Sequence, residues 1–393
     1  MRVEPCSSVE EVRKALAPIF HFFGTTPPTG ESGEQFARLL PPDRMLAADE
    51  DGAVVGGAGS FPFELTVPGG TVRAAGVTVV GVLPTHRRRG ILMAMMRAQL
   101  DDVRARGEPV AYLWASDDRI YGRFGFGIAS FTGEIELSRE RSAFYAPLEP
   151  FGTPRLLSLE AAVDVFPPVY DEVRSVTPGM FRRTRDWWET RALFDAEWRR
   201  QGGGDLVAMA LEDGGQAIGY AIYRIHPLEK IRVVEAMGVT PEAERAVWRY
   251  LLDVDWVERA TASLLPIDHP LLLLLAEPRR LNYKLRDGLW VRLVDVGAAL
   301  GARSFAADGE VVFEVTDAFC PWNEGRWTSR GERTQAEPGL RLDVRELGSV
   351  YLGGFSFRQL ARAGRVEELV EGAVARADAL FATDRAPWCP EIF

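Results

Sequence analysis

Residues 77–100, with the sequence VTVVGVLPTHRRRGILMAMMRAQL, constrain the possible folds of this chain more than any other stretch. The stretch opens with a β-branched apolar run, which is typical of a buried strand, and Pro84 ends that run. A basic turn of His86 and three arginines follows, and an apolar helical pattern begins after Gly90. Because the first amides of a helix lack partners and the helix dipole favours negative charge, this order predicts an anion site suited to a pyrophosphate. The alternative is a solvated basic turn before an ordinary amphipathic helix.

A second patch lies directly downstream. The apolar run from Val110 to Trp114 predicts the next strand, which leads into the glycine-rich sequence ASDDRIYGRFGFG of residues 115–127. The glycines around Tyr121 permit a close approach of the backbone to a ligand. Tyr121 is therefore a candidate functional phenol, and the alternative is a core tyrosine in a tight turn.

Together these motifs resemble the GCN5-related N-acetyltransferases, a family in which Arg/Gln-x-x-Gly-x-Gly/Ala cradles the pyrophosphate of coenzyme A. Arg87 and Gly90 match that pattern, and Leu92 stands where many members have Gly or Ala. The pairing of the arginine turn with the IYGRFGFG segment and a long C-terminal half resembles the Eis (enhanced intracellular survival) branch. This resemblance extends over the whole chain.

The resemblance implies acetyl-CoA as the co-substrate, no metal, and a set of coenzyme-binding positions. In the family, the signature strand pairs with the pantetheine arm, the turn holds the pyrophosphate, and the end of the next strand also touches the coenzyme. In this sequence these positions are Val80, Gly81, Val82, Arg88, Arg89, Gly90, Ile91, Leu92, Met93, Ser116 and Asp117.

The resemblance also implies two catalytic groups. Tyr121 matches the tyrosine that the family uses as general acid, and a phenol with a pKa of ~10 suits a developing thiolate. In the Eis branch the terminal carboxylate of the chain serves as base, which here belongs to Phe393. Its ordinary pKa of ~3.5 makes it a poor base unless it is desolvated or relayed through water, and Glu391 is a second candidate.

The order of expected elements indicates a mixed α+β and α/β fold with several domains, because 393 residues exceed one comfortable core. A helix over 9–23, two hairpins, the signature strand, a helix over 89–106 and a strand over 109–115 form the expected acetyltransferase core at residues 1–147. A strand near 132–137 is expected to close this domain.

Residues 148–287 repeat this order, which indicates a second acetyltransferase-like domain. Its turn carries Pro241, Glu242 and Glu244 where the first copy carries arginines. Glutamates at a helix start satisfy the dipole themselves and repel a pyrophosphate, so this copy is expected not to bind the coenzyme.

Residues 288–393 are expected to form an α+β unit, which resembles the sterol-carrier-type domain at the C-terminus of the Eis branch. The expected elements are strands at 289–296, 311–316, 325–330 and 340–344 and a helix over about 366–380. The chain ends in PWCPEIF, and an apolar tail with two prolines favours a docked segment over a frayed one.

Composition narrows the other possibilities. A formal net charge of −10 disfavours nucleic acid and attracts polyamines. The 4 histidines show no hydrolase or metal spacing, and the 3 cysteines show no disulfide framework, which fits a reducing cytoplasm. No secretory signal is visible at the N-terminus, and the leucine run 271–275 is too short to span a membrane.

Together with these observations, the resemblance implies a cytoplasmic acetyl-CoA-dependent N-acetyltransferase for primary amines of polycationic acceptors, such as aminoglycosides or lysine side chains. In this fold an N-terminal helix commonly borders the acceptor cleft, so Phe22 and Phe23 are candidates to line it, with core packing as the alternative. One rival function is a lipid or sterol carrier, which would need neither the arginine turn nor Tyr121. Another is an acetyl-CoA-binding sensor without turnover. The resemblance implies a homo-oligomer, since family members assemble as hexamers.

Overall fold

The computed structural model describes the backbone of residues 1–393 and the side chains of all of them except Glu31 and Ser32. The chain forms two compact units, and both are discontinuous in sequence. The first comprises Met1–Ser130, Leu289–Asp384 and Ile392–Phe393, and the second comprises Phe131–Gly288 and Arg385–Glu391. Each unit contains its own seven-stranded sheet.

The large sheet of the first unit has the strand order β1-β2-β3-β4-β5-β14-β6. Its strands are β1 Arg2–Pro5, β2 Met45–Glu50, β3 Ala53–Val67, β4 Gly70–Val82, β5 Val110–Trp114, β14 Leu289–Leu293 and β6 Gly127–Ile128. The first four form an antiparallel meander, β4 and β5 run parallel, and β14 lies antiparallel to both of its neighbours. The meander therefore leads into the signature strand as the sequence predicts.

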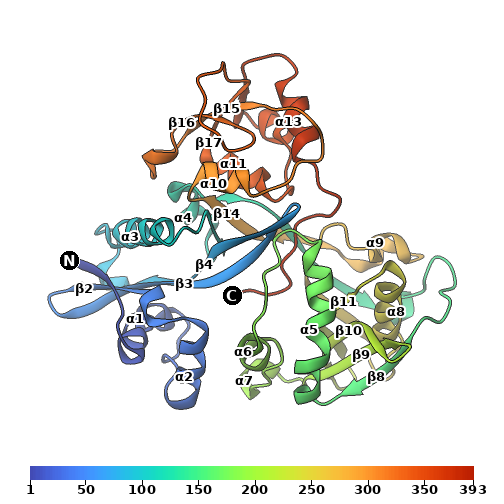
Figure 1. The fold of residues 1–393 in the computed structure, drawn as a ribbon. Helices are drawn as coiled ribbons and strands as arrows, with labels where there is room; N and C mark the ends of the chain where they lie inside the picture. The colour runs from blue at the N-terminus through green and yellow to red at the C-terminus, as the bar shows by residue number, and fades with distance from the viewer. The chain divides into compact units, whose positions relative to one another are not determined.

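Helices cover both faces of this sheet. Figure 1 shows α3 (Ile91–Ala105) on one face and α1 (Val9–Phe22) and α2 (Gly30–Leu39) on the other. α1 lies close to β3 because Gly57 has no side chain, and a Cβ there would collide with the backbone of α1. The sequence predicts α1 and α3, but the elements expected from it do not include α2.

The sheet of the second unit has the strand order β13-β7-β12-β11-β10-β9-β8. Its strands are β7 Phe131–Ser138, β8 Thr153–Leu157, β9 Val207–Asp213, β10 Gln216–His226, β11 Lys230–Gly238, β12 Arg259–Leu265 and β13 Lys284–Asp287. α5 (Leu159–Ser175) and α8 (Pro241–Leu252) lie on opposite faces, each over its own hydrophobic cluster. The strand, hairpin, strand, helix, strand order of the first copy recurs here, as expected.

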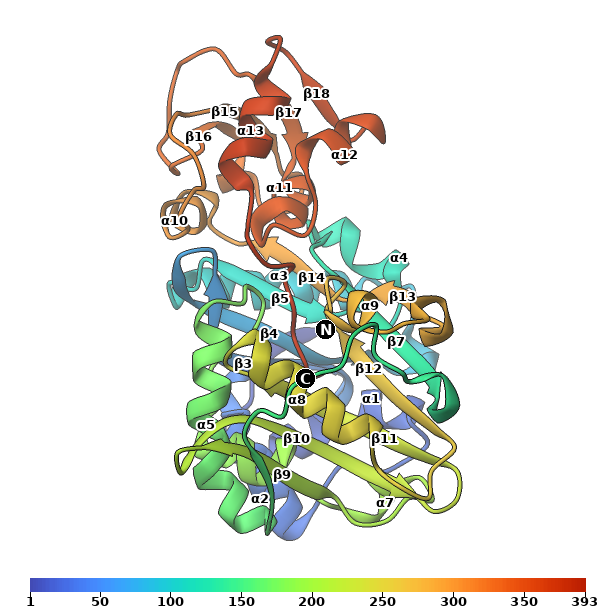
Figure 2. The same cartoon turned by 90° about the vertical axis from the view of Figure 1, so that its right-hand side faces the viewer.

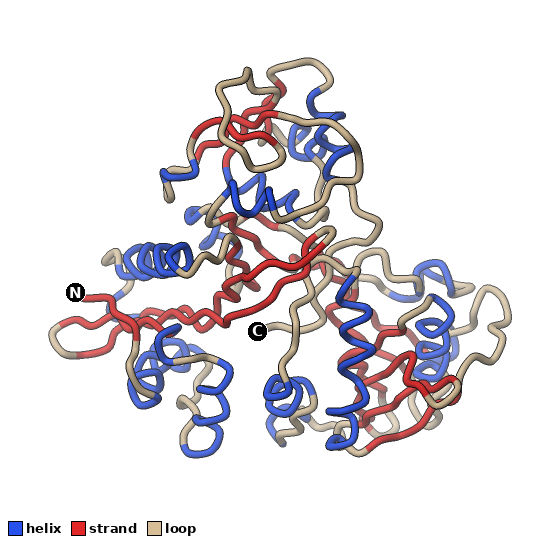
Figure 3. Tube along the Cα trace, viewed as in Figure 1, coloured by secondary structure: helices blue, strands red, loops and turns tan.

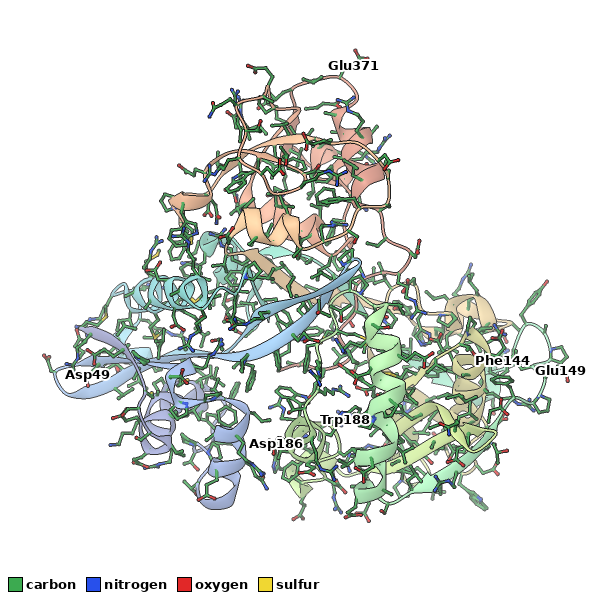
Figure 4. All side chains as sticks on the ribbon, viewed as in Figure 1. Asp49, Phe144, Glu149, Asp186, Trp188 and Glu371 are labelled. Carbon is green, nitrogen blue, oxygen red and sulfur yellow. The ribbon has the colours of Figure 1, made fainter. Side chains whose placement is uncertain are left out.

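Between α5 and β9 the chain forms α6 (Arg185–Trp187), a π-helical turn (Trp188–Ala192) and α7 (Glu197–Arg200). Trp188, labelled in Figure 4, packs against Tyr170 of α5 with 5.4 Å between the ring centroids.

Two strands pair differently from the expectation. The strand near 132–137, expected to close the first domain, is β7, and it pairs with β12 and β13 of the second unit. The strand expected at 289–296 in the C-terminal domain is β14, and it pairs with β5 and β6 of the first unit. Both expectations are wrong, because the alternation of apolar residues tells which face of a strand is buried and carries no information about its partner.

The C-terminal part of the first unit contains a four-stranded sheet with the order β16-β15-β17-β18. Its strands are β15 Val312–Thr316, β16 Gly325–Thr328, β17 Leu340–Asp343 and β18 Val366–Glu368, and its helices are α10 Val296–Gly301, α11 Val344–Tyr351, α12 Phe357–Arg362 and α13 Ala373–Phe381. Figure 3 shows these helices beside the small sheet. The helix expected over 366–380 is wrong in its first part, because β18 pairs there with β17.

Short helical turns complete the fold: η1 Pro42–Arg44, η2 Pro84–His86, α4 Asp118–Tyr121, η3 Gly122–Phe124, η4 Arg139–Arg141, α9 Leu271–Leu274, η6 Pro278–Leu281 and η7 Pro321–Asn323. After α13 the chain continues as an extended tail to the C-terminus (Figure 2). Among the helices that the structure describes, none is both long enough and apolar enough to cross a membrane.

Candidate active site

The signature strand β4 carries a bulge and then separates from its parallel neighbour. Val79 adopts a φ of 46°, which is rare for a β-branched residue, at the point where the register between β3 and β4 shifts. The parallel ladder between β4 and β5 ends at the pair Gly76–Tyr112. Because β4 continues to Val82, the two strands diverge beyond that pair. The divergence therefore begins after Gly76 and includes Val80, Gly81 and Val82.

The strand positions expected to hold the pantetheine arm lie on this diverging segment. Val80 packs into the same hydrophobic cluster as Tyr121, and Leu92 at the start of α3 packs there too. Gly81 touches α1, and a Cβ on it would come within 2.8 Å of Ile19, so this position favours glycine. The strand, the helix start and the candidate acid therefore share one cluster.

The basic turn ends in a helix without a side-chain cap. Arg88 with a φ of 63° and Gly90 with a φ of 83° adopt the left-handed conformation that turns the chain into α3. Gly90 is the N-cap of α3 and has no side chain to bond the first amides, which belong to Ile91, Leu92 and Met93. Arg88 is exposed and forms no ion pair with any side chain that the structure describes. An anion fits this arrangement.

The other cations of the turn have partners that the sequence does not reveal. Glu50 at the end of β2 forms an ion pair with Arg89, with 2.8 Å between Nη2 and Oε1. The same carboxylate lies 3.5 Å from His86 Nε2. Arg87 lies over the ring of Phe22, with 4.5 Å between Cζ and the ring centroid. These partners come from β2 and α1, so no local signal in the turn could identify them.

The end of α1 exposes two aromatic rings. Phe22 is 41% exposed and Phe23 is 64% exposed, so the alternative of core packing is wrong for both. Through the contact between Phe22 and Arg87, these rings adjoin the basic turn.

Tyr121 lies at the end of α4 and is 6% exposed. Burial raises the pKa of its phenol to about 12, and a hydrogen bond with Ser116 opposes part of that rise. Its ring packs edge-on against Phe126, with 5.9 Å between the centroids. The phenol therefore stays protonated at neutral pH and is available as a donor.

Ser116 and Asp117 follow β5 as expected, and both have local partners. Ser116 reaches the Tyr121 phenol. Asp117 is the N-cap of α4, and its carboxylate accepts hydrogen bonds from the amide (3.0 Å) and from Nε (3.0 Å) and Nη2 (2.8 Å) of Arg119. The hydrogen bonds with Arg119 lower the pKa of Asp117 to about 2. Asp117 thus fixes the start of the segment that carries Tyr121.

The glycine-rich loop after α4 packs against the C-terminal part of the same unit. Phe124 meets Phe319 edge-on, with 5.2 Å between the ring centroids. The buried guanidinium of Arg292 pairs with Asp317 at 2.6 Å and lies so close to Gly125 that a Cβ there would collide with it. The sterol-carrier-like part therefore supports the loop that follows the tyrosine.

The terminal residue Phe393 docks where β4 and β5 begin to diverge. Its ring is 9% exposed and packs against Phe63 of β3, with centroids 5.1 Å apart, and Tyr112 of β5, with centroids 4.9 Å apart. Gly76 lies beside both rings, because a Cβ there would collide with Phe63 at 2.3 Å and come within 3.2 Å of Phe393. The structure thus brings the last residue of the chain to the sheet that carries the basic turn.

Glu391, the other candidate base, belongs to the second unit. Its carboxylate lies 3.0 Å from Arg183 Nη2 and accepts a hydrogen bond of 2.7 Å from Trp187 Nε1. Arg183 also donates two hydrogen bonds, of 2.8 and 2.6 Å, to Glu235. The Glu391 carboxylate is therefore engaged by side chains of the second unit.

The described part of the chain contains no group of three or more His, Cys, Asp or Glu side chains that could hold a metal ion. His269 is buried, and burial lowers the pKa of its imidazole to about 3, so it stays neutral.

Comparisons with known proteins assign families to three parts of the chain. The acetyltransferase (GNAT) domain family matches residues 7–129 and, in a second form, residues 179–293, and the sterol carrier protein domain family matches residues 296–390. An uncharacterised N-acetyltransferase of Streptomyces coelicolor is 44% identical over 98% of both chains. The N-acetyltransferase Eis of Mycobacterium tuberculosis is 36% identical over 98% of both chains.

Solved structures of acyltransferases resemble this chain over its full length. Eis1 from Mycobacterium abscessus superposes with a TM-score of 0.88 at 36% identity and covers 100% of both chains. A probable N-acyltransferase of Enterococcus faecalis shares the fold, with a TM-score of 0.86 at 20% identity, over 100% of this chain and 99% of its own. Two acetyltransferase domains and a sterol-carrier-like domain, with full-length similarity to Eis proteins, place this chain in the Eis family of GCN5-related N-acetyltransferases.

Proposed function

We propose that this N-acetyltransferase transfers the acetyl group of acetyl-CoA to primary amines of polycationic acceptors, such as aminoglycosides or lysine side chains. One observation carries the proposal: a bulged strand diverges from its neighbour and leads through an arginine turn into an uncapped helix. Diverging strands offer backbone groups to an arm that contains amides, and the helix start with Arg88 offers donors to a pyrophosphate. Coenzyme A contains both groups.

In this proposal the backbone of Val80–Val82 pairs with the pantetheine arm. The amides of Ile91–Met93 and the side chain of Arg88 hold the pyrophosphate. Arg89 contributes less than Arg88, because Glu50 already neutralises it.

Arg88→Ala is expected to weaken acetyl-CoA binding by roughly 10-fold or more, since a charge-assisted hydrogen bond to phosphate is lost. Arg89→Ala should weaken acetyl-CoA binding less than Arg88→Ala, and the double variant should weaken it most. All should keep the fold, because both side chains are exposed. Arg88→Lys is the matched control: it retains the charge without the planar fork, so its affinity should lie between those of the native protein and Arg88→Ala. Calorimetric titration with acetyl-CoA measures each affinity.

The same titration counts the coenzyme sites. α8 in the second unit starts at Thr240, whose hydroxyl accepts a hydrogen bond of 3.2 Å from the Ala243 amide, and Glu242 and Glu244 lie in its first turn. A capped and acidic helix start disfavours a pyrophosphate, so we expect one acetyl-CoA per chain. Two equivalent sites per chain would contradict this expectation.

The chemistry forms a C–N bond and breaks a C–S bond. The neutral amine attacks the thioester carbonyl, and the departing thiolate takes the phenolic proton of Tyr121. The proton of the attacking amine passes to the Phe393 carboxylate, directly or through water. A later proton transfer from that carboxylic acid to the phenolate, through water, restores both groups.

Two features support a cationic acceptor. The formal net charge of −10 attracts polycations over long distances. Phe23 at the end of α1 exposes 64% of its surface, and aromatic faces bind ammonium groups through cation–π contacts.

The KM for a polyamine acceptor is expected to rise with ionic strength, since attraction between exposed charges is screened beyond ~8–10 Å. A neutral monoamine is the matched control, and its KM should be high at low salt and insensitive to salt. Initial rates over a salt series measure both. If neutral monoamines prove equally good substrates and salt has no effect, the negative charge of the protein does not select the acceptor.

A thiol-release assay with acetyl-CoA and a panel of amines tests the proposed reaction directly. Coenzyme binding without thiol release for any amine would favour the sensor. Binding of a fatty-acyl or sterol probe by the full chain, again without turnover, would favour the carrier. We also propose a cytoplasmic location and a hexameric assembly, and sedimentation velocity tests the assembly.

A further inference from the structure

The gap between diverging parallel strands recurs in the second unit. The register between β10 and β11 shifts at Val234, which makes a bulge in β11. The parallel ladder between β11 and β12 ends at the pair Val233–Ala262, while β11 continues to Gly238. These two strands therefore diverge as β4 and β5 do. The second copy has kept the sheet geometry of a coenzyme site, although its turn is acidic.

Trp388 of the C-terminal tail fills this gap. Its indole Nε1–H donates a hydrogen bond to the carbonyl of Leu264 on β12. Its amide donates a hydrogen bond of 2.8 Å to the carbonyl of Pro178, and its side chain is 9% exposed. The cavity that remains between the two strands, Trp388 and Pro390 measures about 10 Å³. A cavity of this size holds one water molecule at most, so the tail leaves no space there for a pantetheine arm among the described residues.

The second unit also holds the tail on both sides of Trp388. Upstream, the amide of Ala386 donates a hydrogen bond of 2.8 Å to the carboxylate of Asp268. Downstream, Glu391 pairs with Arg183 at 3.0 Å. The tail is thus fixed at three points along seven residues that cluster with the second unit, Arg385–Glu391.

Arg183 can bind a carboxylate of the tail. Its side chain is 1% exposed and lies over the rings of Tyr170 and Trp188, at 4.2 and 4.7 Å from Cζ to the centroids. Glu235 from β11 takes two of its donors. A guanidinium has five N–H donors, so it can serve a second carboxylate, and Glu391 supplies it.

We propose that the second acetyltransferase-like domain is a clamp for the chain's own C-terminal tail, with Trp388 as a positioning residue for Phe393. This inference rests on the proposed role of the Phe393 carboxylate. In the second unit, Trp388 takes the position that pantetheine is proposed to take in the first. Five residues of extended chain span at most about 17 Å, so an anchored Trp388 confines the terminal carboxylate to a small volume. The Glu391 ion pair shortens the free segment to Ile392 and Phe393.

Carboxypeptidase digestion followed by mass spectrometry tests the clamp without relying on turnover. Trp388→Ala is expected to release Phe393 at least about 10-fold faster than the native chain, because a tail that is not held opens more often. Trp388→Phe keeps a ring but loses the N–H donor, so it should release Phe393 at a rate between those of the native chain and Trp388→Ala. Trp198→Ala is the matched control: Trp198 belongs to the same unit, is 75% exposed, and should behave as native. Steady-state rates and acetyl-CoA affinities are measured on the same proteins.

The expected result for Trp388→Ala is faster release, a lower kcat and an unchanged affinity for acetyl-CoA. Equal release from the native chain and from Trp388→Ala would overturn the clamp. Faster release with native kcat would support the clamp and refute the Phe393 carboxylate as base, so the two proposals fail separately. Glu391→Gln is a second variant in case Trp388→Ala does not fold. It loses the ion pair with Arg183, and native release from it would also overturn the clamp.

Discussion

Removal of Ile392 and Phe393 is expected to slow acetyl transfer by roughly 10²-fold while acetyl-CoA binding stays unchanged. The deletion withdraws the terminal carboxylate that we propose as base, and a general base contributes about this factor or more. The deletion does not alter the coenzyme turn between β4 and α3, and the ring that it removes packs against Phe63 and Tyr112. Steady-state kinetics measure kcat, calorimetry measures coenzyme affinity, and circular dichroism confirms equal folding.

Two further proteins separate the charge of Phe393 from its packing. A short C-terminal tag keeps the residue and displaces the carboxylate. A semisynthetic Phe393 carboxamide keeps the ring against Phe63 and Tyr112 and removes only the charge. Both should be as slow as the truncated chain. Equal rates for the native, truncated and tagged proteins would mean that the base lies elsewhere.

Tyr121→Phe is expected to lower kcat by roughly 10²-fold or more, with little change in the affinity for acetyl-CoA. The substitution keeps the buried ring and its contact with Phe126 and removes only the hydroxyl. Burial raises the pKa of the native phenol to about 12. That value lies above the unfolded value of ~10, so the phenol of the folded enzyme keeps its proton throughout the range from about pH 7 to pH 10. The native enzyme should therefore not lose activity through ionisation of Tyr121 in that range.

Tyr351→Phe is the matched control for Tyr121→Phe. Tyr351 is also a buried tyrosine of the first unit, and its hydroxyl donates a hydrogen bond of 2.9 Å to the carbonyl of Ala299. Its loss should lower the free energy of unfolding by about 1 kcal/mol and leave kcat unchanged. If Tyr121→Phe turned over at the native rate, Tyr121 would not be the general acid and would serve only in packing.

The basic turn could be predicted because all of its parts are neighbours in sequence. A strand, a proline, three arginines, a glycine and a helix follow one another within residues 77–100, and each local signal agrees with the next. The unequal environments of Arg88 and Arg89 could not be predicted. Glu50 lies on a separate strand, and nothing in its own neighbourhood tells which arginine it meets.

The docking of the tail was predictable, but its contacts were not. Two prolines and an apolar composition favour a fixed segment, and this can be read from seven residues. The groups that receive Trp388 and Ala386 are the carbonyl of Leu264 and the carboxylate of Asp268. Every residue has a backbone carbonyl, so the sequence cannot tell which of them accepts a hydrogen bond. A single aspartate in a loop has many possible roles. The role of Glu391 was left open for the same reason, since Arg183 is remote in sequence.

The pairing of β5 with β14 determines when the sheet of the first unit can be completed as the chain is synthesised. β5 ends at Trp114 and its partner begins at Leu289, so the ribosome makes the whole second copy before the sheet of the first can close. Until then β5 presents an open edge, the kind of surface on which nascent chains aggregate, and such non-local pairing slows folding. β7 depends in the same way on β12, which is made much later. A chain that stopped before β14 would leave the sheet of the first unit open at β5 and would leave β6 without its partner strand.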